Sequence, residues 1–447
     1  MSRLLSLSTG SVALAAMLAS SLSVTTAASA SSTVDAAISF VAGQQRDDGG
    51  FGSGEAGFPG FETPDAVLAI GAAAQSGSSW SAAEALAAVQ AVANGGKTGL
   101  SYLDDFADGV YGSLSAGNAA RIVIVAASLG IDPAAFDPDG DGSVDLVATM
   151  QAGLLPDGSF GAGTMNTTLT AMLAYRAAGL AAPAGSVAYV EGVQQTNGSW
   201  DYAGDATGAE ADPDTTGLAL VALVASGRGH DDPSVSGGLS FLASAQNADG
   251  TWSEAFGGES NPSSTALAML GIRALGFDPA APCWRDVGMP DALGAPYASP
   301  VDALVALQRE DGHLASPFDE WGVNTLGTTQ GVQALARGYV PPVVATPPEC
   351  PVVATTTTAA ATTTTSNPVG TVGSTSTSAP SSTSTTVIPA TTTATSSGST
   401  VGGSLPRTGS DPRRGVALGL TLLGAGLTSL TLSVRAGRRR GAAGGRG

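Results

Sequence analysis

The sequence predicts an all-α protein whose folded part, residues 31–352, is an α6/α6 toroid, a closed ring of six helix pairs. Two observations support this prediction. A short motif recurs along these residues, and each copy stands between an amphipathic stretch and a nearly all-apolar stretch. Such a period indicates one repeated helix pair that buries its apolar surface against its neighbours. A disordered stalk and one transmembrane helix are predicted to follow the ring.

The recurring motif combines a Gln, a turn that contains Gly, and an aromatic or apolar residue. Its clearest copies run from Gln194 to Trp200 and from Gln246 to Trp252. The looser copies are Gln45 to Phe51, Gln151 to Phe160 and Gln308 to Leu314, with a divergent one at Asp108 to Tyr111. These six units divide the folded part into six repeats.

A polar cap follows each motif and begins an apolar helix. In Asp212-Pro213 and Asn261-Pro262 a side-chain acceptor precedes a residue without an N–H, as a helix start requires. The other caps are Thr63-Pro64-Asp65, Gly117-Asn118, Asn166-Thr167-Thr168 and Asn324-Thr325. The helices after the caps are apolar all round, which places them inside, whereas those before the motifs carry polar faces. An open solenoid would use the same pairs but would need polar end caps.

The two ends of the chain carry export and anchoring signals. Residues 1–30 have the charged, apolar, small-residue order of a signal peptide cleaved after Ala30; an uncleaved anchor is the alternative. Residues 353–404 are mostly Thr, Ser and Pro or small apolar residues without charge, which predicts a disordered stalk. Residues 415–434 are uncharged and long enough to cross a bilayer, and the basic tail at 435–447 is expected to stay cytoplasmic.

A pentapeptide stands just before the predicted transmembrane helix. It consists of Leu405, Pro406, Arg407, Thr408 and Gly409. With the apolar span and the Arg-rich tail it resembles the LPxTG sorting signal of Gram-positive surface proteins. The resemblance implies that a sortase cuts after Thr408 and joins it to cell-wall peptidoglycan, following single-pass membrane insertion. A plain membrane anchor is the alternative.

Charge and cysteine content further restrict the function. The folded part holds 9 Lys and Arg against 36 Asp and Glu, a net charge of −27. Such a surface repels nucleic acid and anionic lipid and favours cations. Cys283 and Cys350 are the only two cysteines, and in an exported chain they predict one disulfide, worth about 4 kcal/mol, that ties the end of the domain to its body. Two free thiols are the alternative.

The Gln…Gly-x-Trp turns, followed by an Asp-x-Asp-x-Thr cap, resemble the QW repeats of the squalene–hopene cyclase and prenyltransferase superfamily. The resemblance covers nearly all of the folded part. It implies a terpenoid cyclase-like toroid with a ligand cavity at the N-terminal ends of the inner helices. It also implies a structural role for the repeat residues, which tie neighbouring helices together: Gln194, Trp200, Gln246 and Trp252.

The resemblance also raises the question of catalysis. Asp212, Asp214 and Thr215 align with the Asp-x-Asp-Asp motif of class II cyclases, in which Asp214 matches the proton donor and Thr215 replaces the third acid. Only 5% of residues are aromatic, few for the walls of a carbocation site. A helix cap is the alternative role of the two acids. Neither His230 nor His313 has a partner at zinc-ligand spacing, so no zinc site is expected.

One loop outside the repeats resembles a calcium loop. Its acids fall at positions 1, 3, 5 and 9 of that pattern, with Gly142 at position 6. The candidate Ca²⁺ ligands are Asp137, Asp139, Asp141 and Asp145. The last ligand position is Ala148, which cannot bind. A hydrophilic linker is the alternative, and no other cofactor is predicted.

These observations favour a surface-anchored binding module for an extracellular small molecule or glycan. Its expected cavity rim consists of Asp65, Tyr202, Asp212, Asp214, Asn261 and Asn324. The alternative is an enzyme, either a cyclase relative or a polysaccharide-acting toroid, with Asp212 or Asp214 as acid and Glu210 or Glu259 as base. A purely structural or adhesive surface protein is a third class.

Overall fold

The computed structural model describes residues 30–52, 61–75, 79–161, 165–208, 210–255, 258–317, 319, 323, 325–336 and 338–351. The chain divides into two units, Met1–Ala354 and Thr355–Gly447, and all the described residues belong to the first. The predicted signal peptide (apart from Ala30), stalk, sorting motif, transmembrane helix and tail lie outside the described residues. Within these residues no helix combines the length and the apolar character needed to cross a membrane.

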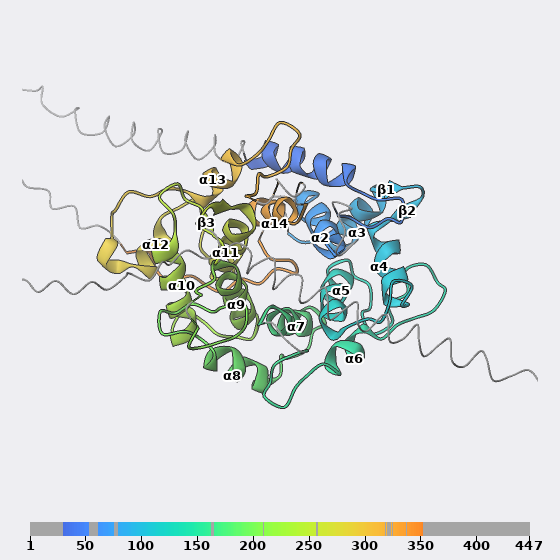
Figure 1. The fold of residues 1–447 in the computed structure, drawn as a ribbon, viewed down its shortest axis with the longest axis horizontal. Coiled ribbons are helices and arrows are strands. Elements are labelled where there is room, and N and C mark those ends of the chain that lie inside the picture. The colour runs from blue at the N-terminus through green and yellow to red at the C-terminus, as the bar shows by residue number, and fades with distance from the viewer. Residues whose placement is uncertain are drawn as a thin grey trace, which may run out of the picture. The chain divides into compact units, whose positions relative to one another are not determined.

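The inner helices form a closed ring (Figure 1). They are α2 (Thr63–Ala73), α5 (Ala116–Ser128), α7 (Met165–Ala177), α9 (Pro213–Ala225), α11 (Pro262–Ala274) and α14 (Thr325–Ala336). Each contacts the next in this order, and α14 contacts α2. Their side chains are buried on nearly all sides, as the apolar stretches predict. Because the ring closes, the repeats form a toroid and not an open solenoid.

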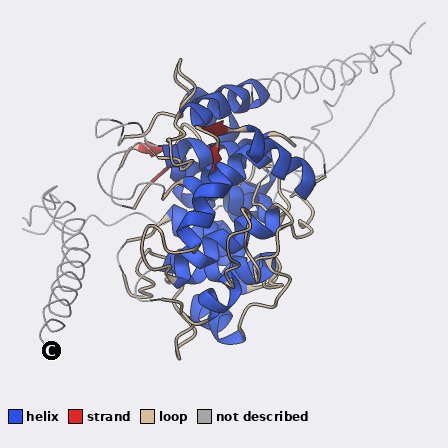
Figure 2. Cartoon of the chain, turned by 90° about the vertical axis from the view of Figure 1, so that its right-hand side faces the viewer, coloured by secondary structure: helices blue, strands red, loops and turns tan. Residues whose placement is uncertain are grey.

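The outer layer consists of the helices that precede the motifs. It holds a helix over residues 30–43, α3 (Ala82–Ala91), α4 (Gly99–Ala107), α6 (Leu146–Gln151), α8 (Ala184–Gly192), α10 (Pro233–Ala245), α12 (Cys283–Gly288), the 3₁₀ helix η1 (Pro290–Ala292) and α13 (Pro300–Ala306). The second and sixth repeats thus carry additional helices that the simple pairing does not predict. Figure 2 shows how fully helices make up the described body.

Two antiparallel strand pairs lie in the connecting loops. β1 (Ala93–Asn94) pairs with β2 (Lys97–Thr98), with Ala93 opposite Thr98. β3 (Trp252–Ser253) pairs with β4 (Ser260–Asn261), with Trp252 opposite Asn261. Both pairs are two residues long, so helix packing and not sheet formation holds the domain together.

The Gln of each clear motif joins its own turn to the next outer helix. Gln194 Nε2 donates to Gly198 O (2.8 Å) and to Ser234 O (2.9 Å) at the start of α10. Gln246 donates to Gly250 O (3.0 Å) and to Ala298 O (3.1 Å) before α13. The repeat residues thus connect neighbouring helix pairs.

The last motif closes the outer layer onto the first helix. Gln308 Nε2 donates to Thr33 O (2.8 Å) in the helix over 30–43 and to Gly312 O (3.1 Å). A Cβ at Gly312, which has φ +100°, would collide with the carbonyl oxygen of Ala36. Glycine is therefore required where this turn meets the first helix.

The motif tryptophans are core residues. Trp200 and Trp252 are fully buried, and their indole N–H groups donate to Val190 O (2.7 Å) on α8 and to Leu242 O (2.9 Å) on α10. A buried Trp needs such a partner for its N–H. The divergent unit differs, because Tyr111 is 43% exposed and stacks on Tyr102 at 4.8 Å.

A hydrogen bond to a threonine on the inner helix joins most repeats, and the repeat pattern in the sequence does not predict it. The threonine hydroxyl accepts the backbone N–H of the aromatic or apolar motif residue at 2.9–3.1 Å. The five donor–acceptor pairs are Phe51–Thr63, Phe160–Thr168, Trp200–Thr216, Trp252–Thr265 and Leu314–Thr328. All five threonines are buried, so each bond satisfies an N–H that has no water to bind.

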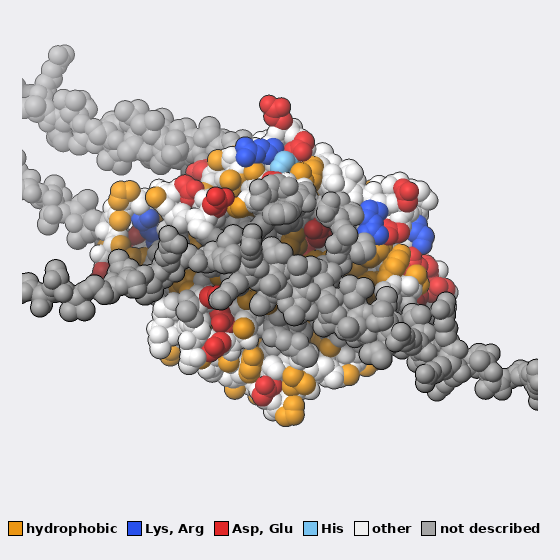
Figure 3. Space-filling view, viewed as in Figure 1, with side chains coloured by type: hydrophobic (Ala, Val, Ile, Leu, Met, Phe, Trp, Pro, Cys, Tyr) orange, Lys and Arg blue, Asp and Glu red, His pale blue; other side chains and the backbone are white. Residues whose placement is uncertain are grey.

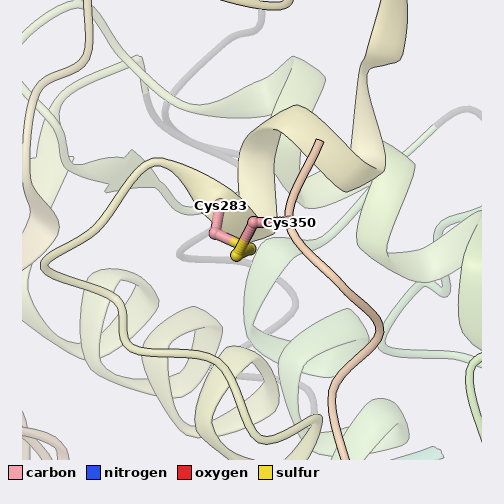
Figure 4. The surroundings of a disulfide bond; sticks show 2 residues. All are labelled: Cys283 and Cys350. Carbon is pink, nitrogen blue, oxygen red and sulfur yellow. A yellow bond between two sulfur atoms is a disulfide. The ribbon is translucent and has the colours of Figure 1, made fainter. Parts of the chain in front are cut away.

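The two cysteines form the disulfide that their number predicts. Cys283 begins α12, and its bond to Cys350 holds the segment after α14 against the domain (Figure 4). Ala345 N also donates to Ala274 O (2.7 Å) at the end of α11.

Acidic side chains are spread over the visible described surface, whereas basic ones gather at few places (Figure 3).

Candidate functional site

A cavity of about 420 Å³ lies within the ring, along the N-terminal halves of the inner helices. All six inner helices contribute to its wall. The lining residues used below are Phe61, Asp65, Asn118, Arg121, Asn166, Tyr202, Leu218, Leu267, Leu270, Gln330, Gln333 and Tyr339. This is the position that the resemblance to the QW-repeat superfamily implies. Its volume suits a small organic molecule.

The charged part of the wall is internally neutralised. Arg121 Nη2 on α5 contacts Asp65 Oδ2 on α2 at 2.5 Å, and the Arg121 guanidinium lies 4.1 Å from the centre of the Phe61 ring. Gln333 Nε2 approaches the Asp65 carbonyl oxygen at 3.5 Å. Among the described residues that line the cavity, Asp65 and Arg121 are the charged ones, whereas the predicted rim holds three acids.

The rest of the wall is amphipathic. Leu218, Leu267 and Leu270 form an apolar part, while Asn118 and Asn166 bring amide groups from α5 and α7. Gln330 Oε1 on α14 is buried and has no hydrogen-bond partner among the described residues. A buried acceptor without a partner is costly, so this oxygen favours a ligand that carries a donor.

Of the five predicted rim residues that the structure describes, only Asp65 and Tyr202 line this cavity. Asp212 and Asn261 are instead used as helix caps: Asp212 Oδ1 accepts from Asp214 N (3.0 Å), and Asn261 Oδ1 accepts from Ser263 N (2.8 Å). Asp214 is not a lining residue either, and Asn324 lies outside the described residues. The cap role competes with ligand binding because it turns the side chain onto its own helix start.

Asp214 is an unusual acid even though it does not line the cavity. Burial, followed by the nearby charge of Asp212, raises the pKa of Asp214 to about 8, while the Ser264 hydroxyl acts in the opposite direction. Its Oδ1 atom is buried and has no hydrogen-bond partner within the described ranges. Burial also raises the pKa of Asp212, against the hydrogen bonds from Thr215 and Asp214. At neutral pH we therefore expect Asp214 to hold its proton.

The raised pKa of Asp214 predicts a pH-dependent stability. Because the folded protein holds a proton that the unfolded chain releases, the free energy of unfolding falls as pH rises from about 4 to 8. Asp214→Asn should remove this loss and be more stable than the natural protein at pH 8, by on the order of 2 kcal/mol. Urea unfolding at pH 5 and pH 8 measures the free energy of unfolding of both proteins. Glu259→Gln, at an exposed acid, is the control; equal pH slopes in all three proteins would contradict the assignment.

The other acids considered as catalytic partners are placed apart from the cavity. Glu210 and Glu259 are exposed and do not line it. Glu62, an acid outside the predicted site, precedes α2, and burial raises its pKa to about 7 against the effect of the Thr325 hydroxyl. The repeat pattern does not predict Glu62, Arg121 or Gln330, because none of them belongs to a repeated unit.

Comparison with known proteins identifies the fold of the chain. Sequence comparison finds no match to a protein-family model or to a curated protein. Among solved structures, a variant of the type II terpene cyclase MstE from Scytonema, in complex with geranylgeranyl dihydroxybenzoate, aligns with a TM-score of 0.51 and 14% identity, over 70% of this chain and 97% of that chain. The chain has the toroid fold of the terpene cyclases.

Two further similar structures are weaker matches to this cyclase-like toroid. Apo MstE aligns with a TM-score of 0.48 and 14% identity, over 69% of this chain and 98% of that one. A protein from Actinoplanes aligns with a TM-score of 0.43 and 17% identity, over 68% and 98%. The similarity concerns the fold alone.

Proposed function

We propose that the cyclase-like toroid is a non-catalytic binding module that captures a small amphipathic molecule outside the cell. The observation that carries the proposal is the cavity at the inner-helix N-termini, with its leucine wall and the buried, unpartnered Gln330 Oε1. An apolar body would pack on Leu218 and Leu270, and a hydroxyl or amine would donate to Gln330. Both features are those of small-molecule sites, which are mostly apolar with a few placed polar groups.

The position of the acids supports binding over catalysis. A general acid must come within hydrogen-bond reach of the atom it protonates. Asp214, the residue that aligns with the cyclase proton donor, does not line the cavity, and Thr215 stands in place of the third acid. Among the described residues that line the cavity, Asp65 is the one carboxylate, and Arg121 is paired with it.

The terminal signals support a surface location for this module. The proposed order is export, membrane insertion at residues 415–434, cleavage by sortase after Thr408, and attachment to peptidoglycan in a Gram-positive wall. The disulfide between Cys283 and Cys350 fits an exported chain, because such bonds persist outside the reducing cytosol. The stalk at residues 353–404 would hold the toroid away from the membrane.

Native mass spectrometry of the chain after exposure to culture medium tests the binding proposal. We expect a retained small molecule in the natural protein. Asn118→Trp, which fills the cavity from α5, should retain at least tenfold less, and Ser236→Trp on the exposed face of α10 is the matched control. Gln330→Leu should weaken retention about tenfold if its oxygen accepts from the ligand. No retained molecule, or equal retention by Asn118→Trp, would reject the module.

The second candidate function is cyclisation of a polyprenyl substrate, and the raised pKa of Asp214 favours it specifically. The similar MstE structure was solved with geranylgeranyl dihydroxybenzoate, so this compound is a suitable probe. A cyclised product that disappears in Asp214→Asn would support the enzyme. Intact substrate after prolonged incubation would leave the binding module as the better account.

A further inference from the structure

A cluster of four carboxylates lies in the outer layer, away from the cavity. Asp137, Asp139 and Asp141 come from the loop between the second and third repeats, and Asp104 comes from α4. One carboxylate oxygen of each lies within 4.8 Å of the others. The loop acids are those that the calcium pattern predicts at positions 1, 3 and 5, but Asp104 stands 33 residues before Asp137 and belongs to no calcium pattern.

Asp104 is stronger evidence for a bound ligand than the exposed acids of the cluster are. It is only 1% exposed, and its Oδ1 atom has no hydrogen-bond partner in the part of the chain that the structure describes. Its Oδ2 atom accepts the backbone N–H of Asp139 at 3.1 Å, which holds the loop against α4. A buried carboxylate with an unpartnered oxygen costs free energy unless a cation or donor compensates it. The three neighbouring carboxylates cannot compensate it, because an ionised carboxylate has no hydrogen to donate.

The fourth loop acid of the sequence prediction is used elsewhere. Asp145 Oδ1 accepts from Ala148 N at 2.8 Å and caps α6, so Asp145 is not a member of the cluster. A two-way backbone pairing of Phe136 and Val144 closes the loop before this cap and separates Asp145 from the acids ahead of it. The cluster therefore differs from the predicted ligand set, because it contains Asp104 and not Asp145.

The donor set suits one particular cation. Carboxylate oxygens in a flexible arrangement are the ligands of Ca²⁺, whereas Mg²⁺ demands near-ideal octahedral geometry. Asp139 and Asp141 are exposed, so an ion can enter and keep water ligands. The nearby Lys97 pairs with Asp105 at 2.7 Å, outside the cluster. We propose that Asp104, Asp137, Asp139 and Asp141 bind one Ca²⁺, which joins the interrepeat loop to α4. This site is independent of the proposed function of the cavity.

Calorimetric titration of the full chain with CaCl₂, after treatment with EGTA, tests the site. We expect one ion bound with a Kd of about 10⁻⁴–10⁻³ M, as in extracellular calcium modules, and weaker binding of Mg²⁺. Thermal unfolding should shift upward in CaCl₂ relative to EGTA, because the ion binds the folded chain. No saturable binding up to ten times this range would overturn the proposal.

Three variants identify the ligands. Asp104→Asn should weaken Ca²⁺ binding at least tenfold and abolish the thermal shift, while the protein in EGTA becomes no less stable because a buried charge is removed. Asp139→Asn, at an exposed position, should weaken binding at least tenfold without a risk to folding. Asp145→Asn is the matched control and should change the affinity less than twofold. If Asp145→Asn lost Ca²⁺ affinity tenfold while Asp104→Asn kept it, the ligands would be those of the sequence pattern, and this site would be rejected.

Discussion

Trp200→Ala is expected to lower the free energy of unfolding by about 3–5 kcal/mol, among the largest effects of a single substitution in this protein. Trp200 is fully buried, and its indole N–H donates to Val190 O at 2.7 Å. The substitution leaves a large void beside α8 and α10, where the ring lies against Gly238, and an unpaired carbonyl at Val190. Since the ring is closed, we expect one cooperative unfolding transition in urea, shifted to a lower midpoint.

Trp200→Phe separates the two contributions of the indole. It keeps most of the ring volume but removes the N–H donor, so a loss of about 1–2 kcal/mol is expected. Tyr111→Ala is a second comparison, because Tyr111 takes the corresponding place in the divergent unit but is 43% exposed. It should cost less than 1 kcal/mol. A Trp200→Ala protein as stable as Tyr111→Ala would show that the motif aromatic does not hold the repeat together.

The ring could be predicted from the sequence because each repeat shows its turn and its cap locally. Gly198 has φ +90°, and a Cβ there would collide with the carbonyl oxygen of Gly237. Glycine is therefore required beside Gln194 and Trp200, whose side chains make the bonds to the neighbouring helices. Because such a turn and cap recur in each repeat, the sequence shows six units, and six units predict a ring of six helix pairs.

The threonine bonds could not be predicted in the same way. Thr216 follows Trp200 by 16 residues, Thr265 follows Trp252 by 13, and Thr168 follows Phe160 by only 8. The intervening loops differ in length, so the bond has no fixed spacing in the sequence. What remains constant is a position in space, where the start of an inner helix meets the preceding turn.

The candidate sites depended even more on tertiary structure. Asp65 and Arg121 are 56 residues apart and meet only because α2 and α5 are neighbours in the ring. Asp104 and Asp139 are 35 residues apart and meet across the outer layer. A polar residue at a helix start can serve as a cap or as a ligand, and the sequence alone did not distinguish these roles for Asp212 and Asp145.

Removal of the disulfide is the second large effect expected. The Cys283→Ser/Cys350→Ser double variant should lose about 4 kcal/mol of stability, because the bond closes a loop with a sequence separation of 67 residues. In the folded protein the segment before Cys350 also buries Val343 in the core and makes the bond from Ala345 N to Ala274 O. Urea unfolding of the oxidised protein and the variant measures the difference.

A reducing agent gives the matched control for this prediction. Dithiothreitol should lower the unfolding midpoint of the natural protein to that of the double variant and leave the variant itself unchanged, because only the natural protein has the bond. If reduction shifts both proteins equally, the effect is not that of the disulfide. If the variant is as stable as the oxidised protein, the prediction is wrong. Other contacts, such as those with α11, would then fix this segment without the disulfide.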